Sequence, residues 1–247
     1  MNIAVIPSRY GSSRFPGKPL AIIAGKPMIQ RVAEQAAKAR NIHRVVVATD
    51  DDRIAETVTA CGIEVIMTAS ELRSGTDRVA RATDMLGVSP RDVVVNIQGD
   101  QPVFMPECID DLIRPFSLEP GLGMSTLAYR IVDPRELEDP KDVKVTFDRS
   151  GYALYFSRAR IPFPRDPGTQ AATFKHLGFY AYTKAFLDTV AELDSGTLEN
   201  VEKLEQLRVL EHGFRIKVVI TQFDSPEVDA PEDIHRIETS RHLGERL

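Results

Sequence analysis

The sequence has few of the features that would assign it to a specialised class of protein. Only two cysteines, Cys61 and Cys108, occur in 247 residues and they lack metal-ligand spacing, so reduced, packed thiols are expected rather than a disulfide framework. No apolar run approaches the roughly 20 residues of a membrane span. The formal net charge of −5 argues against a protein that coats a nucleic-acid backbone. We therefore expect a folded cytoplasmic protein that binds no nucleic acid and does not insert into a membrane.

Strand-like and helix-like segments alternate through the first hundred residues. Short apolar runs predict the strands, and apolar residues at helical spacing predict the helices between them. In chain order these elements cover residues 2–6, 27–39, 44–49, 52–61, 64–68, 76–86 and 92–98. Such alternation predicts an α/β fold whose mostly parallel sheet carries helices on both faces, with ligands bound beyond the carboxyl ends of the strands.

After about Gly121 the pattern changes to strands with few helices between them. This change predicts an inserted, partly antiparallel region at approximately residues 121–185 that covers the pocket. A helix with Val201, Leu204, Leu207 and Leu210 on one side follows, and then a strand at 215–221 and a final helix. We expect one domain spanning residues 1–247.

The loop after the first strand combines cations with glycines. Arg9, Arg14 and Lys18 are spaced among Gly11 and Gly17. Polyphosphate binding needs close backbone amides and balancing positive charge, and this loop supplies both. It is not a P-loop, because Pro19 follows the lysine where that motif has a hydroxyl. A solvated basic loop is the alternative interpretation.

Two aspartates are candidates for metal ligands. Asp100 in "QGDQP" directly follows a buried strand, and Asp229 in "VDAPED" precedes Pro231. Strand-end carboxylates can hold a magnesium ion that also binds phosphate oxygens. The alternatives are a turn aspartate that bonds its own backbone for Asp100, and a helix-capping or helix-entry aspartate for Asp229.

Other motifs are ambiguous when taken singly. "SGTDR" at 74–78 is either a helix cap or a segment that faces a nucleobase. In the predicted insertion, His176 is more typical of a structural histidine than of a catalytic one. A solvated helix face is the default explanation for Glu205 and Gln206.

Eight segments occur along the chain in a recognisable order: "IPSRYGSSRFPGKPL", "VATDD", "SGTDR", "VNIQGDQP", "YALYFSRARIPF", "HLGFYAY", "VEKLEQLRVL" and "VDAPEDI". Taken together, they resemble the 3-deoxy-manno-octulosonate (Kdo) cytidylyltransferases, also called CMP-Kdo synthetases. The similarity covers nearly the whole chain, and several motifs in one order are more specific than any of them alone.

The resemblance implies a Rossmann-like fold of the nucleotide-diphospho-sugar transferase type and a homodimer. It implies transfer from CTP to the 2-hydroxyl of Kdo, which gives CMP-Kdo and diphosphate for lipopolysaccharide synthesis. It implies Mg²⁺ as cofactor, with Asp100 and Asp229 as its ligands. Nucleotide-binding residues would be Arg9, Arg14, Lys18, Ser74 and Arg78, among which Arg14 and Lys18 would act in catalysis with Asp100. The sugar would contact Gln98, Arg158, His176, Tyr180, Glu205 and Gln206.

The chain also departs from the family pattern. Lys175 stands where many members have arginine, and Ala230 and Ile234 replace residues of a common "VDTPEDL" segment. Several motifs look like a subgroup that acts on 8-amino-3,8-dideoxy-manno-octulosonate (8-amino-Kdo), so that substrate is the main alternative.

Two other functions are more distant alternatives. One is a nucleotidyltransferase for sialic acid or a sugar 1-phosphate, against which the late motifs argue. The other is a nucleotide-binding regulator without catalysis, against which the joint presence of Lys18, Asp100 and Asp229 argues.

Overall fold

The structure is a computed structural model, and it describes residues 1–11, 15–72, 74–166, 168–169 and 171–240. The first half consists of β1 (Asn2–Ser8), η1 (Lys18–Leu20), β2 (Ile22–Ile23), β3 (Lys26–Pro27), α1 (Met28–Ala37), β4 (Arg44–Thr49), α2 (Asp52–Ala60), β5 (Glu64–Met67), α3 (Gly75–Met85), β6 (Val93–Asn96), α4 (Glu107–Ile113) and α5 (Pro115–Leu118). The second half consists of β7 (Met124–Arg130), η2 (Pro134–Leu137), β8 (Lys144–Phe147), β9 (Ala153–Ser157), β10 (Phe174–Thr183), α6 (Lys184–Glu192), α7 (Thr197–Glu202), α8 (Gln206–Glu211), β11 (Lys217–Thr221) and α9 (Pro231–Thr239).

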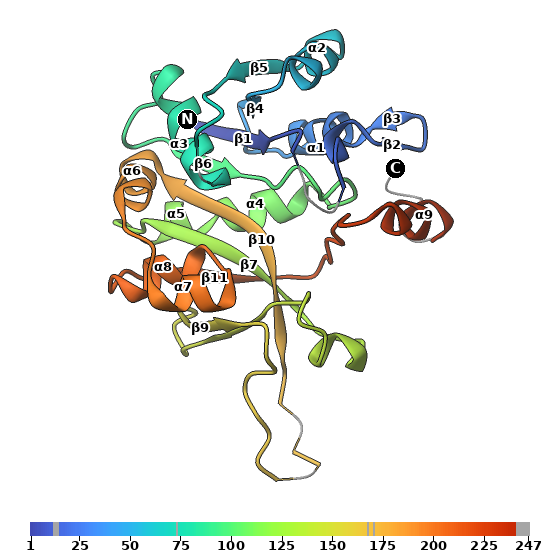
Figure 1. The fold of residues 1–247 in the computed structure, drawn as a ribbon. Coiled ribbons are helices and arrows are strands. Elements are labelled where there is room, and N and C mark those ends of the chain that lie inside the picture. The colour runs from blue at the N-terminus through green and yellow to red at the C-terminus, as the bar shows by residue number, and fades with distance from the viewer. Residues whose placement is uncertain (12–14, 73, 167, 170, 241–247) are drawn as a thin grey trace.

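Nine strands among the described residues form one sheet. Its main path runs β11-β7-β10-β6-β1-β4-β5, and β8 and β9 extend from β10. The pairs β1–β4, β1–β6, β4–β5 and β7–β11 are parallel, whereas β10 is antiparallel to β6 and β7. The predicted α/β fold with a mostly parallel sheet and a smaller antiparallel region is therefore confirmed (Figure 1).

The core lies in two apolar layers, one on each face of this sheet. Alternate residues of β1 point to opposite faces, so Ile3 and Val5 pack in the layer that contains α3, and Ala4 and Ile6 pack in the layer that contains α1. All four side chains are fully buried. A strand covered on both faces needs continuous apolar sequence, which explains the uninterrupted run "IAVI".

Strand β10 joins the main sheet to the extension. Its last residues, Tyr180 to Thr183, pair with β6, whereas Phe174 and Lys175 pair with β8, and its register with β7 shifts between Leu177 and Tyr180. The described part of residues 158–173 projects from the body as an arm (Figure 1). Within the predicted insertion at 121–185, β7 and the second half of β10 thus belong to the main sheet, and β8, β9 and the arm form the extension.

Lys175 fastens this extension to the body. Its side chain is only 8% exposed, and its ammonium lies 2.6 Å from Glu136 Oε1 near η2 and 2.9 Å from Asp224 Oδ2 beyond β11. Asp142 Oδ1 lies 3.9 Å away. Burial lowers the pKa of Lys175, but the carboxylates of Asp224 and Glu136 outweigh it and the net shift is upward. One cation therefore connects three segments of the chain.

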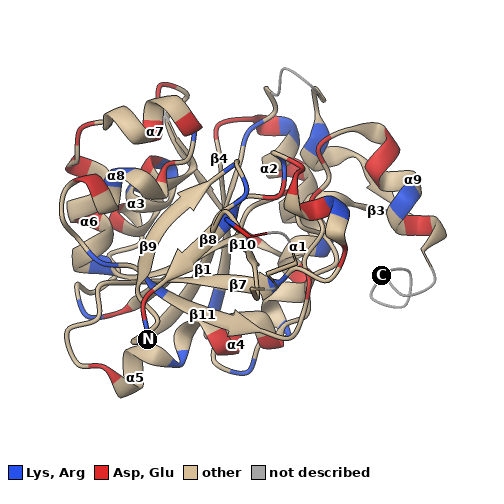
Figure 2. Ribbon diagram, turned by 90° about the horizontal axis from the view of Figure 1, so that it is seen from below, with Lys and Arg blue, Asp and Glu red and all other residues tan. Residues whose placement is uncertain are grey.

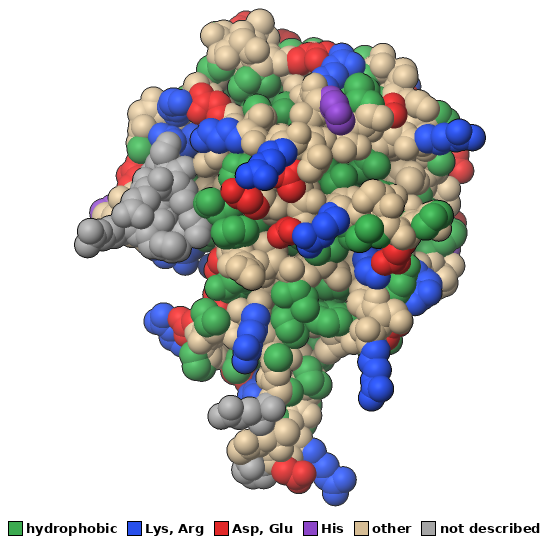
Figure 3. All heavy atoms as spheres, turned by 180° about the vertical axis from the view of Figure 1, so that it is seen from behind, with side chains coloured by type: hydrophobic (Ala, Val, Ile, Leu, Met, Phe, Trp, Pro, Cys, Tyr) green, Lys and Arg blue, Asp and Glu red, His purple; other side chains and the backbone are tan. Residues whose placement is uncertain are grey.

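The surface is mixed in charge. Basic and acidic residues are interspersed along the ribbon (Figure 2), and their side chains are mixed rather than gathered by sign on the face seen from behind (Figure 3). No helix among the described residues is long and apolar enough to cross a membrane. Neither Cys61 nor Cys108 forms a disulfide; Cys108 is buried as expected, whereas Cys61 is exposed and therefore does not serve packing.

Candidate active site

A cavity of about 360 Å³ lies at the carboxyl ends of β1 and β6. Because these strands are parallel neighbours, the loops that follow them meet at one edge of the sheet, as predicted. Five of the predicted lining residues come from the candidate loop and the strand-end motifs, and three more lie at the starts of α3 and α8. The predicted residues that line it are Arg9, Lys18, Ser74, Arg78, Gln98, Asp100, Glu205 and Asp229.

Lys18 is held at the floor of this cavity. Gly17 adopts φ +73°, and a Cβ there would lie 3.1 Å from the Tyr10 ring, so the turn before Lys18 requires glycine. The Lys18 ammonium donates to Asp100 Oδ2 at 2.6 Å and to the Val228 carbonyl at 2.9 Å, and lies 3.8 Å from Asp229 Oδ1. The solvated-loop interpretation is therefore wrong for Lys18. Arg9 is exposed at the rim, and Arg14 lies outside the described residues.

Asp100 and Asp229 are fixed relative to each other by backbone bonds. The Val228 amide donates to the Asp100 carbonyl at 2.9 Å. The amides of Asp229 and Ala230 both donate to Asp233 Oδ2, at 2.8 and 3.0 Å. Asp233 thus caps α9, and the first residue of α9 is Pro231. The Asp229 side chain does not cap this helix. The capping interpretation of Asp229 is therefore wrong, and its carboxylate faces the Lys18 ammonium.

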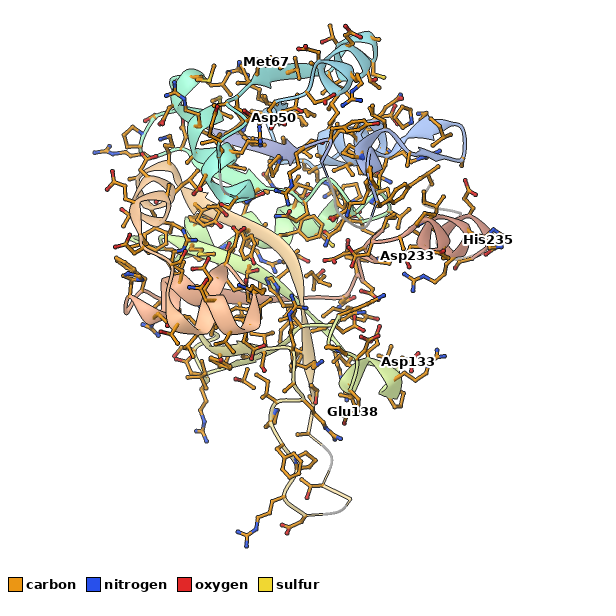
Figure 4. All side chains as sticks on the ribbon, in the orientation of Figure 1. Asp50, Met67, Asp133, Glu138, Asp233 and His235 are labelled. Atoms are coloured by element: carbon orange, nitrogen blue, oxygen red, sulfur yellow. The ribbon has the colours of Figure 1, made fainter. Side chains whose placement is uncertain are left out.

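Ser74 and Arg78 lie on the first turn of α3. Ser74 Oγ accepts from the Asp77 amide at 3.1 Å, so Ser74 caps the helix and also lines the cavity. The Arg78 guanidinium is 4% exposed and donates to Asp50 Oδ2 at 3.0 Å and to Thr68 Oγ1. Asp50 follows β4, beneath Met67 at the end of β5 (Figure 4). Arg78 is therefore a fixed cation at the cavity wall.

Glu205 and Gln206 occupy a break between two helices. The apolar spacing from Val201 to Leu210 predicted one helix, but Lys203 adopts φ +55° and separates α7 from α8. Glu205 Oε2 accepts from Thr76 Oγ1 at 2.9 Å, and desolvation raises the pKa of this carboxyl, which opens onto the cavity. Gln206 is 4% exposed. The solvated-face explanation is therefore wrong for Gln206, whereas Glu205 is exposed to solvent and lines the cavity.

Tyr180 connects β10 to this break. Its hydroxyl donates to Gln206 Oε1 at 3.0 Å, and both residues lie beside Glu205 around a small void. Gln206 Nε2 has no hydrogen-bond partner among the described residues. A buried amide without a partner is costly, so Gln206 offers a donor that a polar ligand could satisfy.

His176 lies next to Tyr180 on β10, within packed aromatic rings. The centroids of His176 and Phe156 are 5.1 Å apart in an edge-on arrangement. Thr126 Oγ1 donates to the Phe179 carbonyl at 2.7 Å, so at 2.8 Å it accepts from His176 Nε2–H. Desolvation lowers the pKa of His176 to about 3. The imidazole is therefore neutral at physiological pH.

This histidine makes stability depend on pH. Because its folded pKa lies below the ordinary 6.5, the unfolded chain takes up a proton that the native protein excludes between pH 6.5 and about 3. In that window the free energy of unfolding should decrease as the pH is lowered, by at most about 1.4 kcal/mol per pH unit. Urea unfolding at pH 7 and pH 5 should show a smaller loss for His176→Gln than for the wild type. His235→Gln, at an exposed position in the middle of α9 (Figure 4), is the control; equal losses in all three would contradict the assignment.

His176 also lines a second cavity, of about 800 Å³, on the other side of Asp229. Asp233 on α9 and Asp133 before η2 lie at opposite ends of it (Figure 4). Glu227 lines it as well and accepts from Gln101 Nε2 at 3.1 Å. Desolvation and then the Asp100 charge raise the pKa of Glu227 to about 7.

The structure does not place Arg158 in the lining of either cavity. Its Nε donates to the Glu202 carbonyl at 2.7 Å and its Nη1 donates to the Pro140 carbonyl at 2.9 Å. These bonds tie the start of the arm to the end of α7 and to the segment between η2 and β8. Contact between Arg158 and a sugar carboxylate stays a prediction.

Sequence reasoning did not identify Asp50, Thr76 or Glu227 as site residues. Asp50 had a signal, because "VATDD" was expected at the ligand edge. Thr76 lies within the quoted "SGTDR" segment. Glu227 had no local signal, since its importance comes from its closeness to Asp100, a residue 127 positions earlier.

The oxygen donors of Asp100 and Asp229 fit a magnesium ion. Both carboxylates already face one cation, the Lys18 ammonium. Magnesium in nucleotide sites typically uses one or two carboxylates and takes its other ligands from phosphates and water. The described residues contain no group of three or more His, Cys, Asp or Glu that could hold a metal ion.

Comparison with known proteins decides the family. A family model described as "Cytidylyltransferase" matches residues 3–218. This chain belongs to the cytidylyltransferase family. A Kdo cytidylyltransferase of Desulfosudis oleivorans is 58% identical over 235 residues, 95% of each chain. An 8-amino-Kdo cytidylyltransferase of Shewanella sediminis is 55% identical over 97% of this chain and 98% of its own.

Solved structures agree with this membership. A CMP:2-keto-3-deoxy-manno-octonic acid synthetase complexed with CTP superposes with a TM-score of 0.91 at 38% identity, over 100% of this chain and 99% of its own. A 4-diphosphocytidyl-2C-methyl-D-erythritol synthase has a TM-score of 0.63 at 16% identity, which shows a shared fold alone. The cytidylyltransferase is therefore an enzyme of the nucleotidyltransferase type.

Proposed function

We propose that this cytidylyltransferase joins CTP to Kdo and releases diphosphate, giving CMP-Kdo. One observation carries the proposal: the strand-end residues predicted for nucleotide, metal and sugar line a single cavity in a chain 58% identical to a Kdo cytidylyltransferase. Phosphoryl transfer needs positioning and charge neutralisation more than a protein nucleophile, and this cavity contains cations facing carboxylates.

The nucleotide is proposed to bind where the cations lie. Lys18 and Arg9 come from the loop after β1, and Arg78 lies on the opposite wall beside the Ser74 cap. Cations at these positions balance the charge of a triphosphate and stabilise the departing diphosphate. Arg78 is held by Asp50 and Thr68 before any ligand arrives, so its contribution needs little reorganisation.

Asp100 and Asp229 are proposed to hold magnesium. When bound there, the ion supplies Lewis-acid polarisation of the phosphate that is attacked. The chain's own part is to hold the two carboxylates at fixed separation through the Val228 amide and the Asp233 cap.

The sugar is proposed to bind where Gln98, Glu205, Tyr180 and Gln206 meet. The Glu205 carboxyl and the unpaired Gln206 amide supply an acceptor and a donor for hydroxyl groups. His176 packs against the Tyr180 ring and is neutral, so it places no positive charge beside the sugar acid. The 2-hydroxyl of the sugar then attacks the α-phosphorus directly.

The second candidate substrate is 8-amino-Kdo, because relatives with that printed activity are nearly as similar as those named for Kdo. We expect kcat/KM with CTP and Mg²⁺ to be at least about tenfold higher for Kdo, since a site built for a hydroxyl leaves an ammonium poorly paired. Diphosphate release at several concentrations of each sugar measures this ratio. A higher kcat/KM for 8-amino-Kdo would reassign the substrate, and release with neither sugar would contradict the proposed function.

We further propose that the enzyme acts as a cytoplasmic homodimer in lipopolysaccharide synthesis. These three statements rest on the family resemblance of the sequence motifs.

A further inference from the structure

The Lys18 ammonium lies where the two proposed metal ligands converge. It is 2.6 Å from Asp100 Oδ2 and 3.8 Å from Asp229 Oδ1. All three side chains are largely shielded from water, at 15%, 26% and 21% exposure. One ammonium therefore partly neutralises two carboxylates at the point where a divalent cation would do the same.

The carboxylates are fixed, whereas the lysine can move. Asp100 and Asp229 are anchored through backbone bonds to Val228 and Asp233. Lys18 has a four-carbon stem and lines the cavity in which the triphosphate is proposed to bind. A rotation about its side-chain bonds would exchange carboxylate partners for phosphate partners without a change of fold.

We propose that Lys18 occupies the place of the divalent cation in the nucleotide-free protein, and that metal binds to Asp100 and Asp229 only when Lys18 turns away to the triphosphate. An ammonium and a divalent cation repel each other at one pair of carboxylates, so they exclude each other from it. A triphosphate provides new anionic partners for Lys18 and thereby frees the pair.

Two consequences follow. Metal alone binds weakly, and nucleotide and metal each promote binding of the other, because coupling between two sites is reciprocal. The carboxylates also never face each other without a cation. The inference rests on the proposed function for the identity of the metal pair, but it concerns binding in the absence of CTP and sugar.

The test is the binding of Mn²⁺ alone to the full chain. The electron paramagnetic resonance signal of the remaining free Mn²⁺ measures this binding. Lys18→Met keeps the length of the stem and removes the competing charge, so its dissociation constant for Mn²⁺ should be at least about tenfold lower than that of the wild type. The double variant Lys18→Met/Asp100→Asn should return to weak binding. Lys26→Met, which removes a surface lysine paired with Glu34, should match the wild type.

Circular dichroism establishes whether each variant is folded. If Lys18→Met is unfolded, Lys18→Gln replaces it in the Mn²⁺ measurement. Equal or weaker Mn²⁺ binding in the folded Lys18 variant would overturn the inference. That result would leave the proposed function standing, because wild-type diphosphate release from CTP and Kdo is measured separately.

Discussion

Asp100→Asn should lower kcat for cytidylyl transfer by about 100- to 1,000-fold. The asparagine keeps the shape of the side chain but removes the charge that both Lys18 and the proposed metal ion use. Initial rates of diphosphate release at saturating CTP and Kdo, with Mg²⁺ varied, measure the effect. Because Asp100 acts on the reacting phosphate through the cations that it holds, we expect the loss mainly in kcat and expect excess Mg²⁺ to recover only part of it.

The control for Asp100→Asn is Asp84→Asn. Asp84 is a half-exposed carboxylate on α3 that pairs with Lys184, and its loss should change kcat by less than about twofold. If Asp100→Asn kept full activity at limiting Mg²⁺, the assignment of the metal and catalytic roles to Asp100 would be wrong.

Lys175→Met should lower the free energy of unfolding by about 3–5 kcal/mol, because it leaves a partly buried group of carboxylates without its cation. Glu136, Asp142 and Asp224 surround Lys175, and burial already raises the pKa of Asp142. Since these residues come from separate segments, their repulsion would loosen the attachment of the extension. Urea denaturation at pH 7 gives the difference.

Lys184→Met provides a matched comparison. The Lys184 side chain is also nearly buried, at 5% exposure, but its partners Asp84 and Asp188 are 51% and 44% exposed and can be hydrated by water. Its loss should cost only about 1 kcal/mol. Equal destabilisation by the two substitutions would show that the Lys175 carboxylates do not repel each other as described.

The first half of the fold could be predicted from sequence because its signals are local. Uninterrupted apolar runs such as that of β1 indicate strands buried on both faces, and glycines mark the helix ends. Once the strands are parallel neighbours, the loops after them must meet, which is why Lys18 and Asp100 could be placed at one site before the structure was known.

The rest depended on contacts that no local pattern contains. The left-handed conformation of Lys203, which separates α7 from α8 and buries Gln206, is invisible in an apolar spacing that suits one helix. The neutral state of His176 comes from its burial against side chains of other strands, such as Phe156. The contact between Lys18 and Asp229 joins residues 211 positions apart.

The measurement that tests the central claim most directly is the formation of product from CTP, Kdo and Mg²⁺ by the purified chain, with diphosphate and CMP-sugar quantified in the same reaction. The account predicts one diphosphate for each CMP-Kdo formed and no diphosphate when either substrate is omitted. Diphosphate release that does not depend on Kdo, or binding of CTP without any release, would contradict it.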